Sequence, residues 1–174
     1  MTNTTECSPN EIYNDIVTAY SVKMDENPGF GNWHLKVAHF PVRFPETVWD
    51  ISYKCGLAII TVTRCLTSVK KQLDLSVNLN QPFAGVPIEI SKGELPAIDY
   101  TVIEVGLGII HGCQNEPQDI EDVEHYKLSF IEGPDRYDAT IYDPYSRDDT
   151  EEWQRLVNRI IGSGLSVPRR FAAA

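Results

Sequence analysis

Residues 54–66, KCGLAIITVTRCL, form the most apolar stretch of the chain. Its longest run without a charge is residues 55–63, whereas a helix that spans a membrane needs about 20 mostly apolar residues. The stretch is therefore too short to span a bilayer. The β-branched residues at 59–63 would suit a strand, so the spacing of the apolar residues has to decide between strand and helix.

Apolar residues in and around this stretch recur at steps of three and four, which is the spacing of one helix face. They are Val48, Ile51, Cys55, Ile59, Val62, Leu66, Val69 and Leu73. Pro45 suits the first turn of a helix, because its missing N–H would have no partner there. The spacing predicts one long helix over about 45–70 that packs on a sheet.

A second apolar row lies on the opposite side of this expected helix: Trp49, Tyr53, Leu57 and Ile60. A helix that is apolar on two sides is usually buried on both. Two explanations stay open. Either the row packs inside its own domain, or it meets another copy of the chain, with Ile12 and Ile16 as the contacts of Trp49 and Tyr53.

The N-terminal segment carries a helix signature. Ser8-Pro9-Asn10-Glu11 is a capping box with proline at the first helical position, and residues 25–32 are rich in turn formers. We expect residues 1–32 to form an arm with a short helix and a linker, and residues 33–171 to form a single globular domain. Residues 172–174, AAA, resemble a cloning remnant and are left out of the fold prediction.

Alternating or glycine-bounded apolar residues predict strands at 33–40, 73–79, 86–90, 100–112 and 165–171, and a hairpin at 125–143. The turn of the hairpin is Glu132-Gly133-Pro134-Asp135. A C-terminal helix is expected at about 150–161, because acids fill its first turn and Gly162 can end it. Short turns between successive strands indicate an α+β fold, with a largely antiparallel sheet of five to seven strands packed by the two helices.

Charge and cysteine content narrow the class of protein. The net charge of −10 arises within residues 114–152, which contain thirteen acids and three bases. The acidic part at 114–124 is either a solvated loop or a docking site for a basic partner. Four scattered cysteines and no secretory signal indicate free thiols in a reducing compartment.

His111, Cys113 and His125 are the best candidates for chemistry, as zinc ligands or as a thiol nucleophile with a histidine base. No second close pair of ligands supports zinc, and little near Cys113 would lower its pKa, so we expect a buried thiol. The glycines at 106 and 108 lie inside a strand rather than before a helix, which does not suit a phosphate loop. The sequence predicts no catalytic residue, no cofactor and no metal.

Six basic residues are grouped in the chain and are either solvated or in contact with phosphate on a lipid or a nucleocapsid. They are Lys70, Lys71, Arg155, Arg159, Arg169 and Arg170.

The order of elements resembles that of rhabdovirus matrix proteins, and the length suits the plant-infecting members. The resemblance covers about residues 33–168 and rests on WHLKVAHFPVRF, an expected helix in PETVWDISYKCG, the strand LDLSVNL, a glycine-rich strand, a hairpin ending in ATIYD and the helix TEEWQRLVNRI. The N-terminus, MTNTTECSPNEIYND, departs from the family because it lacks a lysine-rich stretch and a proline–tyrosine motif. The acidic net charge is a second departure.

The resemblance implies a viral structural protein that self-associates, condenses the ribonucleoprotein and links it to membrane during virion assembly. It implies a location in the virion and in the host cytoplasm, peripheral on internal membranes without a transmembrane segment, with other copies and the nucleocapsid as partners. Membrane contact would fall to Lys70, Lys71 and the C-terminal arginines. The competing interpretation is a small cytosolic adaptor or effector that binds a host protein through its acidic segment, and the third is a thiol enzyme that uses Cys113.

Overall fold

The computed structural model describes residues 9–21, 28–95, 123–142, 155, 157–160 and 169–170. The elements, in chain order, are α1 (Pro9–Ala19), β1 (Trp33–Phe40), β2 (Thr47–Lys54), β3 (Leu57–Cys65), α2 (Val69–Asn78), β4 (Ile88–Leu95), β5 (His125–Glu132), β6 (Asp135–Tyr142) and β7 (Arg169–Arg170). The expected strand at 100–112 and nearly all of the acidic segment at 114–124 lie outside the described residues.

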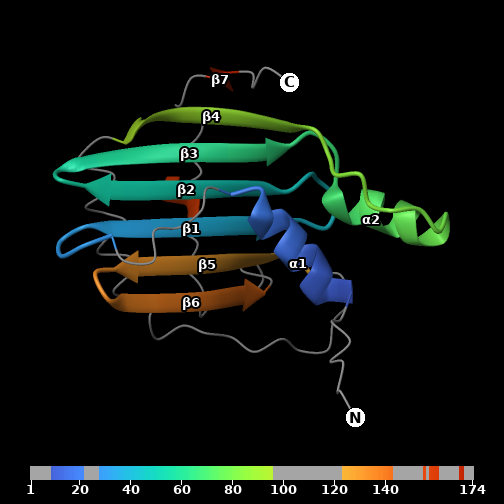
Figure 1. Cartoon of the computed structure of the whole chain (residues 1–174), viewed down its shortest axis with the longest axis horizontal. Helices are drawn as coiled ribbons and strands as arrows, with labels where there is room; N and C mark the ends of the chain where they lie inside the picture. Colours follow the sequence, from blue (N-terminus) through green and yellow to red (C-terminus); the bar gives the residue numbers. More distant parts are fainter. Residues whose placement is uncertain are drawn as a thin grey trace, which may run out of the picture.

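One sheet contains all of these strands in the order β6-β5-β1-β2-β3-β4-β7, and every neighbouring pair is antiparallel (Figure 1). The α+β class and the antiparallel sheet are therefore confirmed. The strand at 33–40, the N-terminal helix and the hairpin at 125–143 also form as expected. Residues 155 and 157–160 are helical, within the range expected for the C-terminal helix.

The long helix predicted at 45–70 is wrong, because this stretch is the hairpin of β2 and β3. Cys55 and Gly56 form its two-residue turn with φ angles of 52° and 82°. Two successive positive φ angles are the signature of a type I′ turn, whose twist matches that of the flanking strands. Residues 54–66 therefore lie in the turn and the second strand of a hairpin in the interior of the sheet.

The apolar residues of this hairpin recur at helix-like steps of three and four because both faces of the hairpin are buried toward one end. Ile51 and Ile60 face one core, and Val48 and Cys65 face the other. Apolar side chains therefore occur on both sides of each strand. A strand buried on both faces loses the alternation that would reveal it in the sequence.

The strand predicted at 73–79 is also wrong, because these residues are mostly the second half of α2. The helix begins after Ser68, whose side chain accepts a hydrogen bond from the Lys71 N–H as an N-cap. Leu75 and Leu79 are largely exposed while Leu73 packs inward, so the alternation of leucine with polar residues does not mark a strand face here.

Two hydrophobic cores lie on opposite faces of the sheet. The larger core includes Trp33, Ile51 and Ile60 and is contacted by Val157 and Ile160 of the C-terminal helical residues. The smaller core joins Val17 of α1 and Val69 of α2 to the face that carries Phe40, Val48 and Cys65. In Figure 1, α1 lies in front of the sheet at one end, and α2 projects from this end beyond the strands.

Candidate functional site: an apolar and basic end of the sheet

Exposed apolar side chains gather at the end of the sheet from which α2 projects. Of the ten large hydrophobic residues that are exposed in the described part of the chain, six belong to the connections and the helix at this end: Val42, Phe44, Leu66, Leu75, Val77 and Leu79. The first two follow β1 and precede β2, and Leu66 follows β3. Because Thr47 pairs with Arg64, these two connections leave the sheet at the same end.

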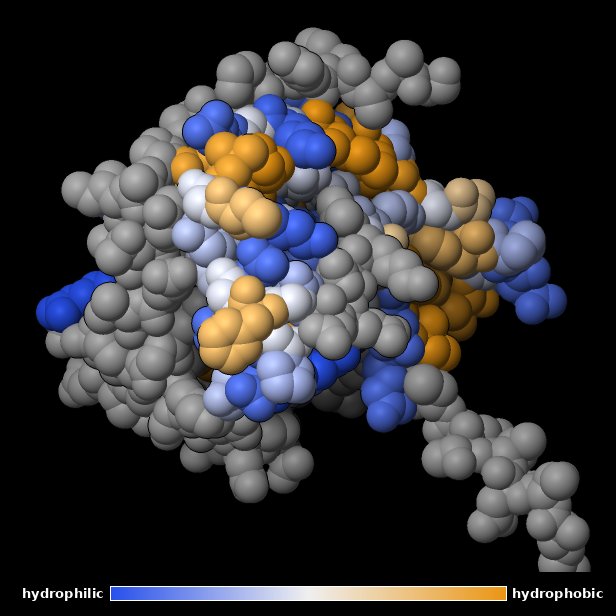
Figure 2. Space-filling model, turned by 60° about the vertical axis from the view of Figure 1, so that its left-hand side comes forward, coloured by the Kyte–Doolittle hydropathy of each residue, from blue (hydrophilic) through white to orange (hydrophobic). Residues whose placement is uncertain are grey.

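The apolar stripe of α2 extends past the sheet that it packs on. Val69 is fully buried and Leu73 is partly buried in the smaller core, whereas Val77, one turn farther on, is 74% exposed. Leu75 and Leu79 are 50% and 62% exposed. Figure 2 shows hydrophobic side chains, in orange, near the side from which this helix projects. The free end of α2 thus presents leucine and valine to the solvent.

Basic residues accompany these apolar ones. Arg43 and Lys71 are exposed and Lys70 is partly exposed, whereas Asp74 is the exposed acid of α2. Lys71, Leu75 and Leu79 follow one another at steps of four, so the cation and the two leucines lie along one side of the helix and its end. Three basic side chains thus lie among the exposed apolar residues of this end, together with the exposed acids Asp74 of α2 and Glu11 and Asp15 of α1.

Glu46 fixes the base of α2 to the sheet. Its side chain is fully buried, and its carboxylate accepts hydrogen bonds from the N–H groups of Val69 and Lys70 at 2.8 and 3.3 Å. Its backbone carbonyl accepts from the N–H of Cys65 at 2.9 Å. A carboxylate at a helix N-terminus is stabilised by unpaired N–H groups and by the helix dipole. The first turn of α2 is thereby held on the strand connection that carries Phe44.

The same carboxylate also holds α1. Tyr13 donates a hydrogen bond to Glu46 Oε1 at 2.7 Å, and burial together with the charge of Glu46 raises the pKa of this phenol well above its ordinary value. Burial, followed by the charge of Glu46, likewise raises the pKa of the Cys65 thiol to about 12. Cys65 is therefore an inert core thiol at neutral pH.

Two further polar contacts attach α1. The Tyr20 hydroxyl accepts from the N–H of Val86 at 3.0 Å, and His125 Nε2 lies 3.3 Å from the side-chain oxygen of Asn14. The His125 ring stacks on Phe40 and Tyr142. His125 is thus a packing residue between α1 and the sheet, and His111 and Cys113, its proposed partners in chemistry, lie outside the described residues.

The structure does not bring the six predicted basic residues together. Lys70 and Lys71 lie in the first turn of α2, whereas Arg155 and Arg159 belong to the helical residues on the opposite face of the sheet. Arg169 and Arg170 form β7, which pairs with β4 at Ser91 and Ile90. Sequence reasoning found Lys70 and Lys71 but missed the exposed apolar residues beside them, because it placed Leu66 in a buried helix and residues 73–79 in a buried strand.

The four residues expected in self-association are also separated. Ile12 is exposed and Ile16 is partly buried on α1, over one face of the sheet. Trp49 and Tyr53 lie on the opposite face, where Trp49 is 6% exposed and Tyr53 stacks on Trp33 with ring centroids 5.5 Å apart. Within one protomer, α1 therefore does not cover the row that contains Trp49.

A buried His–Asp pair is the arrangement that most resembles part of a catalytic site in the described chain. His34 Nε2 lies 3.6 Å from Asp50 Oδ1, and Ser52 is directly opposite His34 on the neighbouring strand. The distance exceeds that of a hydrogen bond, so the histidine lacks the oriented contact on which nucleophilic catalysis depends. Among the described residues, no group of three or more His, Cys, Asp or Glu side chains is placed to hold a metal ion.

Comparisons with known proteins give no relative: no family model, curated protein or solved structure matches the chain. Among the helices that the structure describes, none has the length and apolar content needed to cross a bilayer.

Proposed function

We propose that this protein is a structural protein of the viral matrix type that binds an anionic membrane surface peripherally through the α2 end of its sheet. The observation that carries the proposal is the coincidence of exposed apolar residues with Lys70, Lys71 and Arg43 at one end of an otherwise acidic protein. Apolar side chains enter the boundary between headgroups and acyl chains, and basic residues beside them contact anionic lipid.

The separation of the basic groups suits a protein that links two partners. Arg155 is exposed on the helical residues that pack against the larger core, and α2 adjoins the smaller core on the opposite face. A nucleocapsid held at Arg155 and Arg159 would leave the α2 end free for lipid. Self-association completes the matrix-type function, because a coat needs contacts between copies as well as contacts with membrane and ribonucleoprotein.

The resemblance to rhabdovirus matrix proteins now supports this proposal less than the α2 end does. Two of the elements on which it depended, a helix in PETVWDISYKCG and a strand in LDLSVNL, have the other type of secondary structure. The strand WHLKVAHF and the hairpin ending in ATIYD keep their expected type and order.

Vesicle co-sedimentation tests the proposal. The wild-type protein is mixed at 0.1 M salt with phosphatidylcholine vesicles that contain or lack about 30% phosphatidylserine, because exposed charges act over about 10 Å at this ionic strength. We expect binding to the anionic vesicles. A variant with Leu75→Ser, Val77→Ser and Leu79→Ser should bind at least about tenfold more weakly, because each apolar side chain removed from water contributes on the order of 1 kcal/mol.

Two further variants separate the contributions. Lys70→Glu with Lys71→Glu should weaken binding at 0.1 M salt and matter much less at 0.5 M, because this contribution is electrostatic. Leu57→Ser is the matched control, since Leu57 is also an exposed leucine but lies in the hairpin turn region at the other end of β3. Equal loss of binding in the control, or no binding of the wild-type protein to anionic vesicles, would overturn the proposal.

A further inference from the structure

α1 lies over the sheet at the end from which α2 projects (Figure 1). Two of its described side chains, Tyr13 and Val17, are buried in the smaller core, and Tyr13 packs edge-on against Phe40 with ring centroids 5.4 Å apart. Ile12, by contrast, is 42% exposed. Isolated helices shorter than about 12 residues are marginal in water, so the helical form of α1, with its 11 residues, depends on this contact. α1 is therefore a unit that can open locally while the sheet stays folded.

The apolar surface beneath α1 is continuous with the α2 surface proposed to bind lipid. The smaller core joins Phe40, Val48 and Cys65 of the sheet to Val69 of α2. The stripe that begins at Val69 runs along α2 to Val77, which is 74% exposed. Departure of α1 would therefore extend the exposed apolar surface from the free end of α2 back onto the sheet.

α1 also changes the charge of this end. It carries two acids and contains no lysine or arginine. The charged residues at exposed or partly exposed positions of α1, α2 and the connection between β1 and β2 are Glu11, Asp15, Arg43, Lys70, Lys71 and Asp74. With α1 in place, three acids balance three bases. Without α1, three bases and one acid remain, so its departure leaves a net charge of one sign where none existed.

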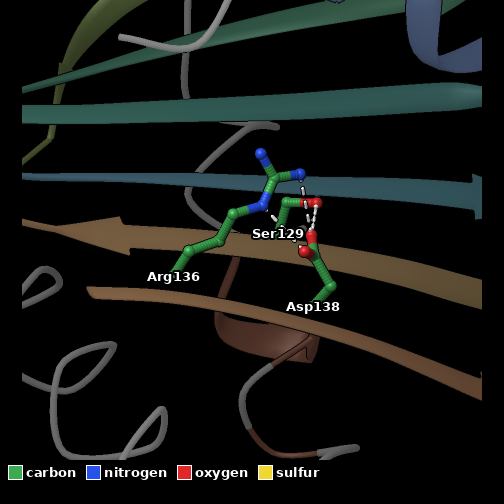
Figure 3. Close-up of polar contacts among 3 residues, drawn as sticks. All are labelled: Ser129, Arg136 and Asp138. Carbon is green, nitrogen blue, oxygen red and sulfur yellow. Dashed lines mark hydrogen bonds and ion pairs between the residues drawn. The ribbon is translucent and has the colours of Figure 1, made fainter. Parts of the chain in front are cut away.

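The acids of α1 also act on a cation of the sheet. Burial lowers the pKa of Lys127 in β5, and the charges of both α1 acids oppose this lowering. Farther along the same face, Arg136 instead has an acid of the sheet: its Nε donates to Asp138 Oδ2 at 2.8 Å, and Asp138 also accepts from Ser129 (Figure 3). Departure of α1 would thus take the two acids away from Lys127 and leave the pair of Arg136 and Asp138 in place.

We propose that α1 is an intramolecular cover of the lipid-binding end and that an anionic membrane displaces it from the sheet. The lipid gains both the apolar face of the smaller core and a net positive charge. The Glu46 carboxylate loses Tyr13 but keeps its hydrogen bonds with Ser68 and with the N–H of Val69, so α2 stays attached. A membrane that binds the uncovered form more tightly shifts the population toward it. The inference rests on the proposed function and deepens it by naming a regulatory element of the same site.

Hydrogen exchange of the wild-type protein tests the displacement directly. Exchange is followed by mass spectrometry at 0.1 M salt, with vesicles that contain or lack about 30% phosphatidylserine. We expect amides of α1 to lose protection in the protein bound to anionic vesicles, while amides of β1 and β3 keep theirs. Equal protection of α1 in the free and the vesicle-bound protein would contradict the displacement.

A release variant tests whether the cover opposes binding. Val17→Asp places an unpaired charge in the smaller core and should detach α1. It should bind anionic vesicles at least about fivefold more tightly than the wild-type protein, because lipid no longer has to displace the helix. Ile12→Asp is the matched control, since it makes the same type of change at an exposed position of α1 and should bind no more tightly than the wild type.

A charge variant tests the electrostatic part without disturbing the core. Glu11→Gln with Asp15→Asn should tighten binding at least about threefold at 0.1 M salt and much less at 0.5 M, because the effect is electrostatic. Glu94→Gln with Asp135→Asn makes the same change in net charge at exposed positions of the other end of the sheet and should leave binding nearly unchanged.

The outcomes separate the cover from the wider proposal. If α1 stays protected on vesicles, or if Val17→Asp binds more weakly while β1 and β3 stay protected, the cover is wrong and membrane binding through α2 still stands. If Val17→Asp also loses protection in the sheet, the exchange of the wild-type protein and the charge variant decide. Binding by none of these proteins would overturn both proposals. Loss of α1 protection on anionic vesicles together with tighter binding of Val17→Asp would support the inference.

Discussion

Glu46 connects three parts of the molecule through one buried carboxylate. It accepts from Tyr13 of α1, from Ser68 and from the first N–H groups of α2, and it lies directly before β2. A charged side chain is rarely fully buried unless hydrogen bonds compensate for its desolvation. In the sequence, the segment PETV, which begins with proline, indicates the start of a helix. The role of Glu46 could not be predicted from it, because the partners of its carboxylate lie 23 and 33 residues away in the sequence.

Replacing Glu46 with alanine should lower the free energy of unfolding by about 3 kcal/mol, because it leaves the Tyr13 hydroxyl and two N–H groups buried without their acceptor. Urea denaturation measures the loss. Tyr13→Phe is the matched control, since it removes one donor and should cost about 1 kcal/mol. A loss below about 1 kcal/mol for Glu46→Ala would show that water replaces these contacts and that the base of α2 is open.

His125 gives the stability a dependence on pH. Burial lowers its pKa, and Lys127, His39 and Lys70 lower it further, against the opposing hydrogen bond with the carbonyl of Val123. The unfolded chain then binds the proton more readily than the folded chain. Stability is therefore present above the ordinary pKa of 6.5 and is lost as the pH falls from 6.5 through the lowered pKa of the folded state.

We expect the free energy of unfolding to decrease below pH 6.5 with a slope of at most about 1.4 kcal/mol per pH unit for each proton taken up. His125→Gln should reduce this slope in urea denaturation at a series of pH values. His39, whose pKa burial also lowers although Glu124 opposes it, should account for a further part of the slope in His39→Gln. An unchanged slope in both variants would contradict this assignment.

At the scale of elements, the sequence predicts some segments well and others wrongly for identifiable reasons. β1, β5 and β6 were predicted because turn formers or proline bound them and because their apolar residues alternate in part. The hairpin of β2 and β3 was missed because it is buried on both faces and because its turn, Cys55-Gly56, lacks the usual asparagine or aspartate before glycine. α2 was missed because its exposed leucines alternate with polar residues.

The turn sequence gives a direct test of the hairpin. Cys55 adopts a φ of 52°, a conformation that asparagine tolerates far better than cysteine. Cys55→Asn should therefore raise the free energy of unfolding by roughly 0.5 to 1 kcal/mol, as measured with urea. In a helix at this position, the same change would leave the stability nearly unchanged, because asparagine and cysteine have similar helix propensities, so the absence of any gain in stability would contradict the hairpin.

At the scale of the whole molecule, the candidate site could be predicted only in part. Lys70 and Lys71 could be identified from the sequence, because they are adjacent in it and no structural information is needed to group them. The apolar part of the same surface could not be predicted from the sequence. Its residues Phe44, Leu66 and Val77 lie on three separate segments, which come to one end only through the pairing of the strands. Exposure depends on where the sheet stops beneath α2, and local spacing does not encode this boundary.

The molecule therefore has two ends with different exposed residues. The α2 end presents Val77 and its apolar and basic neighbours, and the opposite end contains the tight turn of the β2–β3 hairpin with Leu57 beside it (Figure 1). If the protein binds a membrane through α2, the α2 end should become buried in the lipid interface and the hairpin end should stay exposed to water. Environment-sensitive fluorescence can compare the two ends in the same fold.

The most direct measurement attaches such a fluorophore to Val77→Cys or, in a matched protein, to Leu57→Cys, with Cys7, Cys55 and Cys113 replaced by serine. On addition of vesicles that contain phosphatidylserine, the label at position 77 should shift to the blue and resist quenching by iodide, while the label at position 57 should change in neither respect. Equal changes at both positions, or none at position 77 under conditions where the protein sediments with the vesicles, would contradict membrane binding through the α2 end.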